Sequence, residues 1–308
     1  MRGAALLVAL LAAAPALGAL EAVAGRAVDV AGLSGRELME AVHARHQQYP
    51  FVYEEQSMVL IDRRGGRTAR RLERYSRVEP DGTARMMLVF TSPPEVAGVA
   101  LLATQRPAEA DPDGDRMAMY LPALGAELVE SANVGTSTNF LGTDFTIENL
   151  TGEDLGAYRY RRRRSRRVEG MPHHVVDVFD VRDDPVTARP VRRHFLRADN
   201  LYITRTDHYD ELGRVDKRQT THDLRAVDGA LWRGDMILME DFRSGHRTLL
   251  KIDRRVFSRD YVPEAMFGID WLVANRPPPA QREEAAAPDD GLREIVLPEQ
   301  FRPREGRR

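Results

Sequence analysis

The sequence predicts a mostly β (α+β) fold built on a large, curved antiparallel sheet with helices packed in its concave face. The first observation is the rhythm of the chain from Phe51 to Phe257, where short strand-like runs are separated by clusters of Gly, Pro and Asp. Such punctuation is typical of antiparallel strands joined by tight turns. The second is that some runs, such as 86–90 and 175–181, are apolar at almost every position. A strand that is apolar on both faces must be covered on both faces, and helices in the hollow of a curved sheet achieve this.

The first element expected after the leader is a helix that begins at Ser34. Ser34 and Glu37 have the spacing of a capping box, and apolar residues recur at helical spacing up to Tyr49, before Pro50 ends the helix. Strands are then expected at 52–61, 70–78, 85–90, 98–105, 116–121, 127–134, 158–168, 174–181, 191–198, 202–209, 215–227, 231–243 and 248–256. A short helix is expected near 263–267, and it joins the Ser34 helix as a filler of the hollow.

Composition limits the function. The chain has 308 residues, of which 43% are hydrophobic and 30% charged, with a formal net charge of -2. This length suits one large domain or two small ones, and the balanced charge predicts no nucleic-acid binding. The absence of cysteine excludes a disulfide framework, cysteine–metal sites, a thiol nucleophile and lipid attachment to an N-terminal cysteine.

The two ends of the chain differ from its middle. Residues 1–24 combine Arg2 with a short apolar core, which is typical of a signal peptide cleaved after Ala24 or Ala19, with an uncleaved anchor as the alternative. An exported, soluble protein is therefore expected. Residues 25–274 are predicted to form one domain. Residues 275–308 are rich in Pro and charge, and we expect them to be a largely disordered tail.

One central stretch, 115–150, carries the most specific signals. Its first strand alternates so that Met117, Met119 and Leu121 face one side. Further on, Gly142, Thr143 and Asp144 are typical of a structural turn, in which Gly permits a tight backbone and Asp accepts hydrogen bonds from nearby amides.

The segments 119–124 (MYLPAL) and 142–150 (GTDFTIENL) resemble the outer-membrane lipoprotein-sorting protein family, a branch of the LolA-like periplasmic carriers. The resemblance extends more weakly from Val52 to Leu272. Family members often carry several arginines after Pro-Ala-Leu, whereas this chain has GAELVE at 125–130, so no basic role carries over to that segment. The resemblance implies an unclosed half-barrel around a hydrophobic cavity, with helices as a lid.

By the same resemblance, the protein is expected to be a periplasmic carrier that binds lipid or lipoprotein acyl chains. Its task would be lipoprotein sorting or lipid transport to the outer membrane, with an inner-membrane transporter as a partner. Methionine is flexible and polarisable, which suits a cavity for varied acyl chains, although ordinary core filling explains the same residues. The expected cavity residues are Met39, Met117, Met119, Leu121, Phe140, Phe145, Met266, Phe267 and Trp271.

The segment 159–167 holds seven arginines in nine positions. They cannot all be buried, because an unpaired buried charge is too costly, so this strand is expected at an edge or rim. There the charges either discourage aggregation through the edge or bind anionic headgroups or an acidic partner. The arginines expected to make that contact are Arg161, Arg162, Arg163, Arg164, Arg166 and Arg167.

Patterns that indicate catalysis or cofactors are absent from the sequence. His43 with His46, and His173 with His174, lack both an HExxH arrangement and an identifiable third ligand, so no metal is expected. There is no Gly-x-Ser-x-Gly, phosphate loop or dinucleotide fingerprint, so neither an enzyme nor a cofactor is expected. Two alternatives stay open: a signalling or scaffold module that binds a membrane protein, and an enzyme that acts on a hydrophobic substrate through a polar residue such as Asp144.

Overall fold

The computed structural model describes residues 30–46, 49–106, 116–122, 127–131, 139–228 and 231–274. The expected signal peptide and the expected C-terminal tail lie outside these ranges. The strands are β1 (Phe51–Ile61), β2 (Arg67–Val78), β3 (Ala84–Ser92), β4 (Ala100–Gln105), β5 (Arg116–Leu121), β6 (Glu127–Ser131), β7 (Tyr158–Val168), β8 (Met171–Asp180), β9 (Arg192–Arg197), β10 (Ile203–Tyr209), β11 (Val215–Asp228), β12 (Leu231–Asp241) and β13 (Arg247–Val256).

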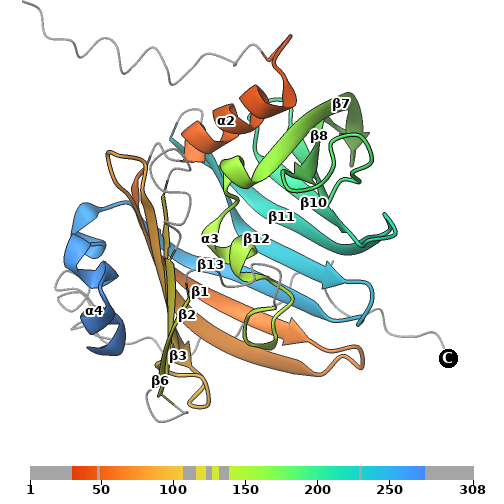
Figure 1. Cartoon of the computed structure of the whole chain (residues 1–308). Coiled ribbons are helices and arrows are strands. Elements are labelled where there is room, and N and C mark those ends of the chain that lie inside the picture. Colours follow the sequence, from red (N-terminus) through yellow and green to blue (C-terminus); the bar gives the residue numbers. More distant parts are fainter. Residues whose placement is uncertain are drawn as a thin grey trace, which may run out of the picture.

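All of these strands belong to one antiparallel sheet, in the order β6-β5-β4-β3-β2-β1-β13-β12-β11-β10-β9-β8-β7. The first and last strands pair in the middle, and two meandering arms extend from them. The arms do not meet, because β6 and β7 stand at opposite ends of the order, and the sheet curves without closing (Figure 1). Its concave side is called the hollow below. The predicted fold class, a mostly β protein with an open curved sheet, is confirmed.

Apolar side chains lie on both faces of the arm β1–β5. Leu72 pairs with Phe90, and Leu88 pairs with Leu101; these side chains face the hollow. Their chain neighbours, such as Met87 and Leu102, face the outside and belong to a second buried cluster. The two-sided apolar pattern of the sequence therefore reflects a sheet that is covered on both faces.

Helix α2 (Gly35–His46) covers the hollow side of the other arm. Its start has the predicted capping box, since Glu37 N donates to Ser34 Oγ at 3.2 Å and Ser34 N donates to Glu37 Oε2 at 2.8 Å. Leu38 and Val42 are buried together with Val176 of β8. The helix that the sequence predicts at this place is therefore present and lies against the sheet.

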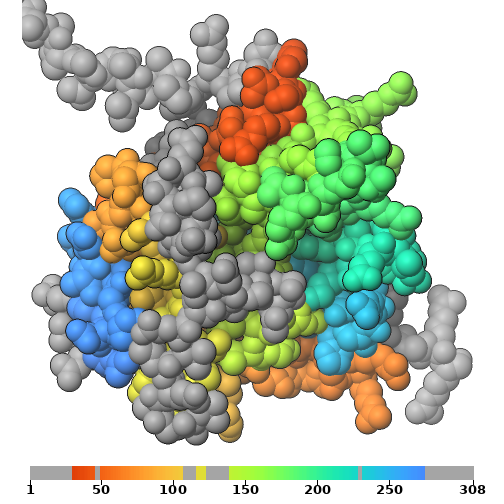
Figure 2. All heavy atoms as spheres, viewed as in Figure 1, coloured from red at the N-terminus to blue at the C-terminus, as the bar shows by residue number. Residues whose placement is uncertain are grey.

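The C-terminal segment covers the opposite, convex face. It contains η4 (Arg259–Tyr261), η5 (Glu264–Phe267) and α4 (Ile269–Ala274), and it forms the blue flank outside the curve of the sheet (Figures 1 and 2). The rings of Tyr53 and Tyr261 lie 5.2 Å apart there. The expectation that the helix at 263–267 fills the hollow is wrong, because outward-facing residues of β1–β5 need a cover of their own. None of the helices within the described ranges has the length and apolar composition that a bilayer crossing requires.

Candidate functional site

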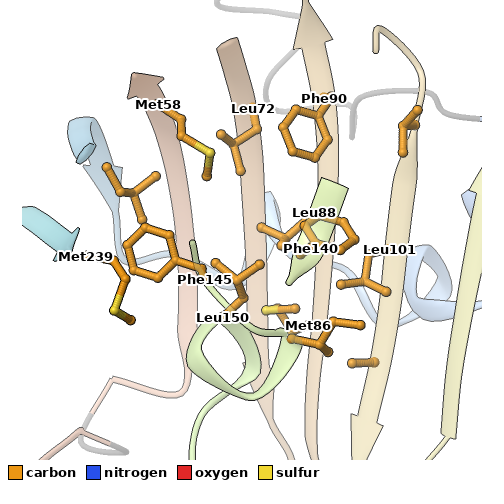
Figure 3. Close-up of a cluster of buried hydrophobic side chains, with 14 residues drawn as sticks. Met58, Leu72, Met86, Leu88, Phe90, Leu101, Phe140, Phe145, Leu150 and Met239 are labelled. Carbon is orange, nitrogen blue, oxygen red and sulfur yellow. The ribbon is translucent and has the colours of Figure 1, made fainter. Parts of the chain in front are cut away.

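The hollow of the sheet has an apolar half over β1–β5, β12 and β13. It is covered by the segment 139–157, here called the insert, which contains η2 (Phe140–Gly142), α3 (Ile147–Thr151) and η3 (Leu155–Ala157). Apolar side chains of the insert meet those of the strands in one buried cluster (Figure 3). The cluster includes Met58, Leu72, Met86, Leu88, Phe90, Leu101, Phe140, Phe145, Ile147, Leu150, Met239 and Leu250.

A tight turn opens the insert. Phe140 N donates to Phe145 O at 2.8 Å, and Thr143 N donates to Phe140 O at 2.9 Å. Gly142 has a φ of +74°, in the left-handed region that glycine adopts without a steric penalty. Thr146 then caps α3 reciprocally with Asn149, which fixes the direction of the short helix.

Asp144 is buried and bonds across the fold rather than within its own turn. Thr248 of β13 donates its hydroxyl to Asp144 Oδ2 at 2.7 Å and accepts from Asp144 N at 3.0 Å. Lys217 of β11 donates to Asp144 O at 3.2 Å. The expected bonds from nearby backbone amides to this carboxylate are replaced by the Thr248 hydroxyl, and burial raises the pKa of Asp144 above its ordinary value.

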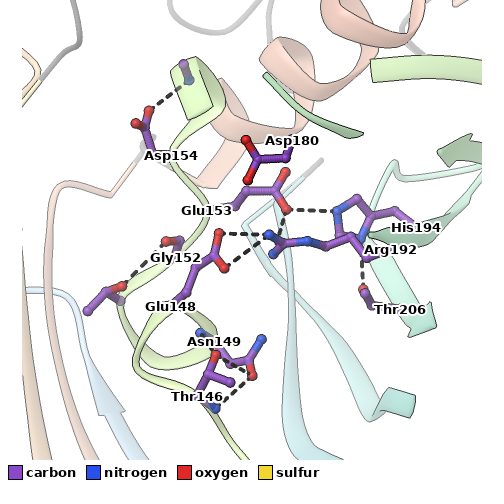
Figure 4. A network of polar contacts seen from close by, with 12 residues as sticks. Thr146, Glu148, Asn149, Gly152, Glu153, Asp154, Asp180, Arg192, His194 and Thr206 are labelled. Atoms are coloured by element: carbon purple, nitrogen blue, oxygen red, sulfur yellow. Dashed lines mark hydrogen bonds and ion pairs between the residues drawn. The ribbon is translucent and has the colours of Figure 1, made fainter. Parts of the chain in front are cut away.

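The other half of the hollow has a charged floor. Arg192 of β9 donates through Nη2 to both carboxylate oxygens of Glu148 at 2.9 and 3.0 Å, and its Nη1 lies 3.1 Å from Glu153 Oε2 (Figure 4). Its guanidinium also lies over the ring of Tyr158 at 4.3 Å. Burial alone lowers the pKa of Arg192, but Glu153 and Glu148 outweigh it and raise that pKa. The insert is thus fastened to the sheet by a buried ion pair on each side of one arginine.

Glu153 collects further contacts from the strands. His194 Nε2 lies 3.1 Å from Glu153 Oε2, and Tyr160 donates its hydroxyl to Glu153 Oε1 at 2.6 Å. Burial raises the pKa of Glu153, but the charges of His194 and Arg192 and the bonds from His194 and Tyr160 outweigh burial and lower it to about 2. Glu153 is therefore an ionised carboxylate at any physiological pH.

His208 of β10 lies between Arg192 and Lys217 in the strand register, on the floor of the hollow. Its Nε2 is buried and has no hydrogen-bond partner within the described ranges. Burial, followed by the charges of Arg192, His194 and Lys217, lowers the pKa of His208 to about 3, so the ring is neutral at physiological pH. Within the same ranges, no group of three or more His, Asp or Glu side chains is arranged to hold a metal ion.

The structure distributes the expected cavity residues over three places. Phe140 and Phe145 belong to the insert and are buried against the strands, and Met117, Met119 and Leu121 are partly buried against the same cluster. Met39 lies in the cluster of α2 at the other arm. Met266, Phe267 and Trp271 lie on the convex face with the C-terminal segment. Five of the nine residues thus meet in the apolar half of the hollow.

The arginine-rich segment forms β7, which stands at one end of the strand order, so the prediction of an edge strand is confirmed. Its arginines do not share one role. Arg162 is half-buried and donates to Val30 O and Leu33 O, which holds the approach to α2. Arg163 pairs with Asp177 at 3.1 Å on the convex face. The exposed ones are Arg161, Arg163, Arg164, Arg166 and Arg167.

Sequence reasoning missed the charged floor altogether. Glu148 lies inside the central stretch 115–150, but no sequence pattern there indicates that its partner is Arg192, 44 positions later. The alternation of Arg192, His194 and Leu196 on one face of a strand was the available signal, because polar groups on a covered face require partners.

A comparison with protein families finds one model, whose description reads "Uncharacterized protein", that matches residues 82–273, more than half of the chain. No curated protein gives a significant match. Several solved structures, in contrast, match this chain. A domain described as an outer membrane lipoprotein-sorting protein, from Vibrio parahaemolyticus, is 20% identical with a TM-score of 0.69, covering 78% of this chain and 98% of its own.

Two further structures share the fold. A DUF1329 family protein from Desulfovibrio piger is 22% identical, with a TM-score of 0.68 and coverage of 77% of this chain and 97% of its own. A LolA superfamily protein from Nitrosomonas europaea is 14% identical, with a TM-score of 0.60 and coverage of 78% and 100%. The chain therefore belongs to the family that the matching model describes, and its fold is that of the LolA-like outer-membrane lipoprotein-sorting proteins.

Proposed function

We propose that this protein is a periplasmic, non-enzymatic carrier that binds the acyl chains of a lipid or lipoprotein in the hollow of its sheet. It would serve lipoprotein sorting or lipid transport to the outer membrane and would work with a transporter in the inner membrane. The observation that carries the proposal is the cover of the apolar half: a segment of short helical turns lies on an apolar sheet, held both by apolar side chains and by polar contacts to the strands.

Displacement of the insert would uncover apolar side chains from β12 to β4. That surface continues onto β5, where Met117, Met119 and Leu121 are only partly buried while the insert is in place. An acyl chain could first settle along β5 and then take the place of Phe140 and Phe145. The acyl chain would thus contact Met117, Met119 and Leu121 on β5 first, and would reach the places of Phe140 and Phe145 afterwards.

The hydrophobic effect is large enough for such an exchange. Each buried methylene contributes about 0.8 kcal/mol, so one long acyl chain gains on the order of 10 kcal/mol before ordering costs. The insert loses its own apolar contacts when it moves, so the net gain is smaller and the exchange is reversible. Reversibility suits a carrier, which must release its cargo to a partner.

The proposal is tested by direct loading. The purified protein is titrated with a fluorescent fatty acid, and its co-purifying lipids are identified by mass spectrometry. We expect saturable uptake that Met119→Glu reduces at least tenfold, because a carboxylate on β5 cannot be buried against an acyl chain. Trp271→Ala is the matched control, since Trp271 lies on the convex face and should leave uptake unchanged.

Two results would contradict the carrier. One is the absence of both bound lipid and saturable uptake in the wild-type protein. The other is an equal loss of uptake in Met119→Glu and Trp271→Ala while circular dichroism shows both to be folded, since binding would then not depend on the hollow.

A second candidate function is a scaffold or signalling module that binds a membrane protein partner instead of lipid. The exposed Arg164, Arg166 and Arg167 on the outermost strand favour it, because guanidinium groups pair with carboxylates in a forked geometry. A stoichiometric acidic partner, captured from envelope extract by a lipid-free protein and lost with Arg164→Glu and Arg166→Glu, would support this function over the carrier.

A further inference from the structure

Five apolar residues at the middle of the sheet form a buried cluster, here called the seam cluster. It consists of Val59 and Ile61 of β1, Leu249 of β13, and Met236 and Leu238 of β12. Val59 pairs with Leu249, and Leu249 pairs with Leu238, so three of the five form one row across the strands. The cluster lies where the first and last strands pair and the two arms of the sheet diverge.

The seam cluster faces the convex side of the sheet. Along each strand its members alternate with residues of the apolar cluster that the insert covers, namely Met58, Leu60, Ile237, Met239 and Leu250. Because successive side chains of a strand point to opposite faces, the seam cluster points away from the hollow. Neither the insert nor α2, which both lie in the hollow, covers it.

The seam cluster is nevertheless almost completely shielded from solvent. Only 2% of Ile61, 3% of Met236 and 1% of Leu249 is exposed. By contrast, Ala69 of β2, which pairs with Val59 on the same face, is exposed. The pleat of the sheet alone therefore does not hide side chains on this face, and burial this complete requires a segment that lies across them.

The cover is absent from the described ranges. Within them, only strand residues contribute to the seam cluster. The described part of the C-terminal segment packs elsewhere on the convex face, since it joins the cluster that contains Tyr53, Met87 and Leu102. The cover therefore comes from a part of the chain outside the described ranges, or from another molecule.

The sequence after Ala274 holds one apolar stretch, LREIVLPEQF at 292–301, whereas 275–291 consists mainly of Pro, Ala and charged residues. The apolar run within 1–24 is the expected signal peptide, which leaves the mature chain. No comparable apolar run occurs in the internal segments outside the described ranges, which are 47–48, 107–115, 123–126, 132–138 and 229–230. Among the parts of the mature chain that could supply the cover, 292–301 thus has the matching composition.

The linker 275–291 is long enough for this stretch to reach the seam cluster. It starts after α4, where Leu272 packs in one cluster with Leu102 of β4 and Ala118 of β5 on the convex face. From β4 to β13 the strand order gives a distance of about 20 Å, at about 4.8 Å per strand. An extended chain covers about 3.4 Å per residue, so the linker spans up to about 55 Å. Both ends lie on the same face, so the linker need not pass around an edge of the sheet.

We propose that residues 292–301 lie across the seam cluster of their own chain, with their large apolar side chains packed on β1, β13 and β12. These three strands are paired on both sides, so the stretch binds through side chains and not as an added strand. It braces the junction of the two arms from the side opposite the hollow. The expectation of a disordered tail then applies to the linker 275–291.

Binding of a synthetic peptide of residues 291–302 tests the docking. We expect saturable binding to a chain truncated after Asp290. Binding to the full chain should be at least about tenfold weaker, because the tethered stretch competes at an effective concentration of about millimolar. A chain truncated after Arg302 is the matched control and should bind the peptide as weakly as the full chain. The peptide with Ile295→Asp and Leu297→Asp should not bind, because a carboxylate on the seam cluster would be buried without a partner.

Cross-linking in the full chain identifies the face. The sequence has no cysteine, so an engineered pair alone reacts with a short bismaleimide. Lys251 lies on the convex face opposite Met236, with 43% of its side chain exposed, whereas Thr68 is exposed on the concave face opposite Leu60. We expect Lys251→Cys to cross-link with Glu299→Cys at least about fivefold more than Thr68→Cys does, because only the first pair is held close together.

The docking is overturned if the peptide binds the full chain as tightly as the truncated chain, or binds neither. It is also overturned if the two cysteine pairs cross-link equally, or if the links join two molecules, because the cover would then be a second copy of the chain. If the chain truncated after Asp290 fails to fold, the cross-links in the full chain decide. Its fatty-acid uptake should be unchanged, since the seam cluster shares no residue with the cluster in the hollow. This separates a failure of docking from a failure of the carrier function.

Discussion

Arg192 and Glu148 join the floor of the hollow to its cover: the guanidinium on β9 donates to both carboxylate oxygens on α3, at 2.9 and 3.0 Å. Both side chains are largely buried, with 8% and 15% of their surfaces exposed. Because a buried charge without its partner is costly, this pair holds the insert in one position on the sheet.

Replacement of Arg192 by Met should lower the free energy of unfolding by about 3–5 kcal/mol, since two buried carboxylates lose their cation. Denaturant unfolding measures this, and hydrogen exchange should show faster opening of residues 139–157. Arg182→Met is the control, because the exposed pair of Arg182 with Asp180 should contribute at most about 1 kcal/mol. Equal losses in the two variants would contradict the role assigned to Arg192.

Stability should fall in acid because of Glu153. Its pKa is about 2 in the folded protein and 4.5 when unperturbed, so its contribution is complete above about pH 4.5 and is lost as the pH falls toward 2. The shift corresponds to about 3 kcal/mol. Urea unfolding at a series of pH values should show this decline, and Glu153→Gln should be less stable at neutral pH with a flatter profile. An unchanged profile in Glu153→Gln would contradict the assignment.

The sheet could be predicted from sequence because its signals are local. Alternation and turn residues within ten positions placed β5 at Arg116–Leu121 and β7 at Tyr158–Val168, as the structure has them. The capping box of α2 is likewise contained in four residues.

The site could not be predicted in the same way, because its contacts connect distant segments. Asp144 meets Thr248 across 104 positions, and no pattern near Asp144 distinguishes that partner from a turn amide. The sequence also does not determine whether the C-terminal helix covers the concave or the convex face of the sheet. Strands such as β3 are apolar on both faces, so the sequence requires two covers without saying which segment provides each.

The hydroxyl of Thr248 should be needed to hold the insert against β13, because it bonds to Asp144. Thr248→Val keeps the shape of the side chain but leaves the buried Asp144 carboxylate without its hydroxyl donor, which should cost about 1–3 kcal/mol. Thr248→Ser retains the hydroxyl and should recover most of that loss. Thermal unfolding of the two variants at neutral pH measures the difference. If serine were as destabilising as valine, packing of the methyl group, not the hydrogen bond, would be the cause.

Gly35 should be irreplaceable at the contact between α2 and β7. A Cβ on Gly35 would lie 2.7 Å from the backbone C and O of Tyr160 and 2.8 Å from Arg162 N, and strand backbone cannot give way as a flexible side chain would. Gly35→Ala should therefore push the helix away and destabilise the protein by about 1–3 kcal/mol, with faster hydrogen exchange in residues 35–45. Gly268→Ala is the control, because its Cβ would meet only Ala265 O at 3.7 Å, an ordinary contact. If Gly35→Ala unfolds at the same denaturant concentration as the wild type, α2 is not held by this close approach, and its buried side chains Leu38 and Val42 alone keep it on the sheet.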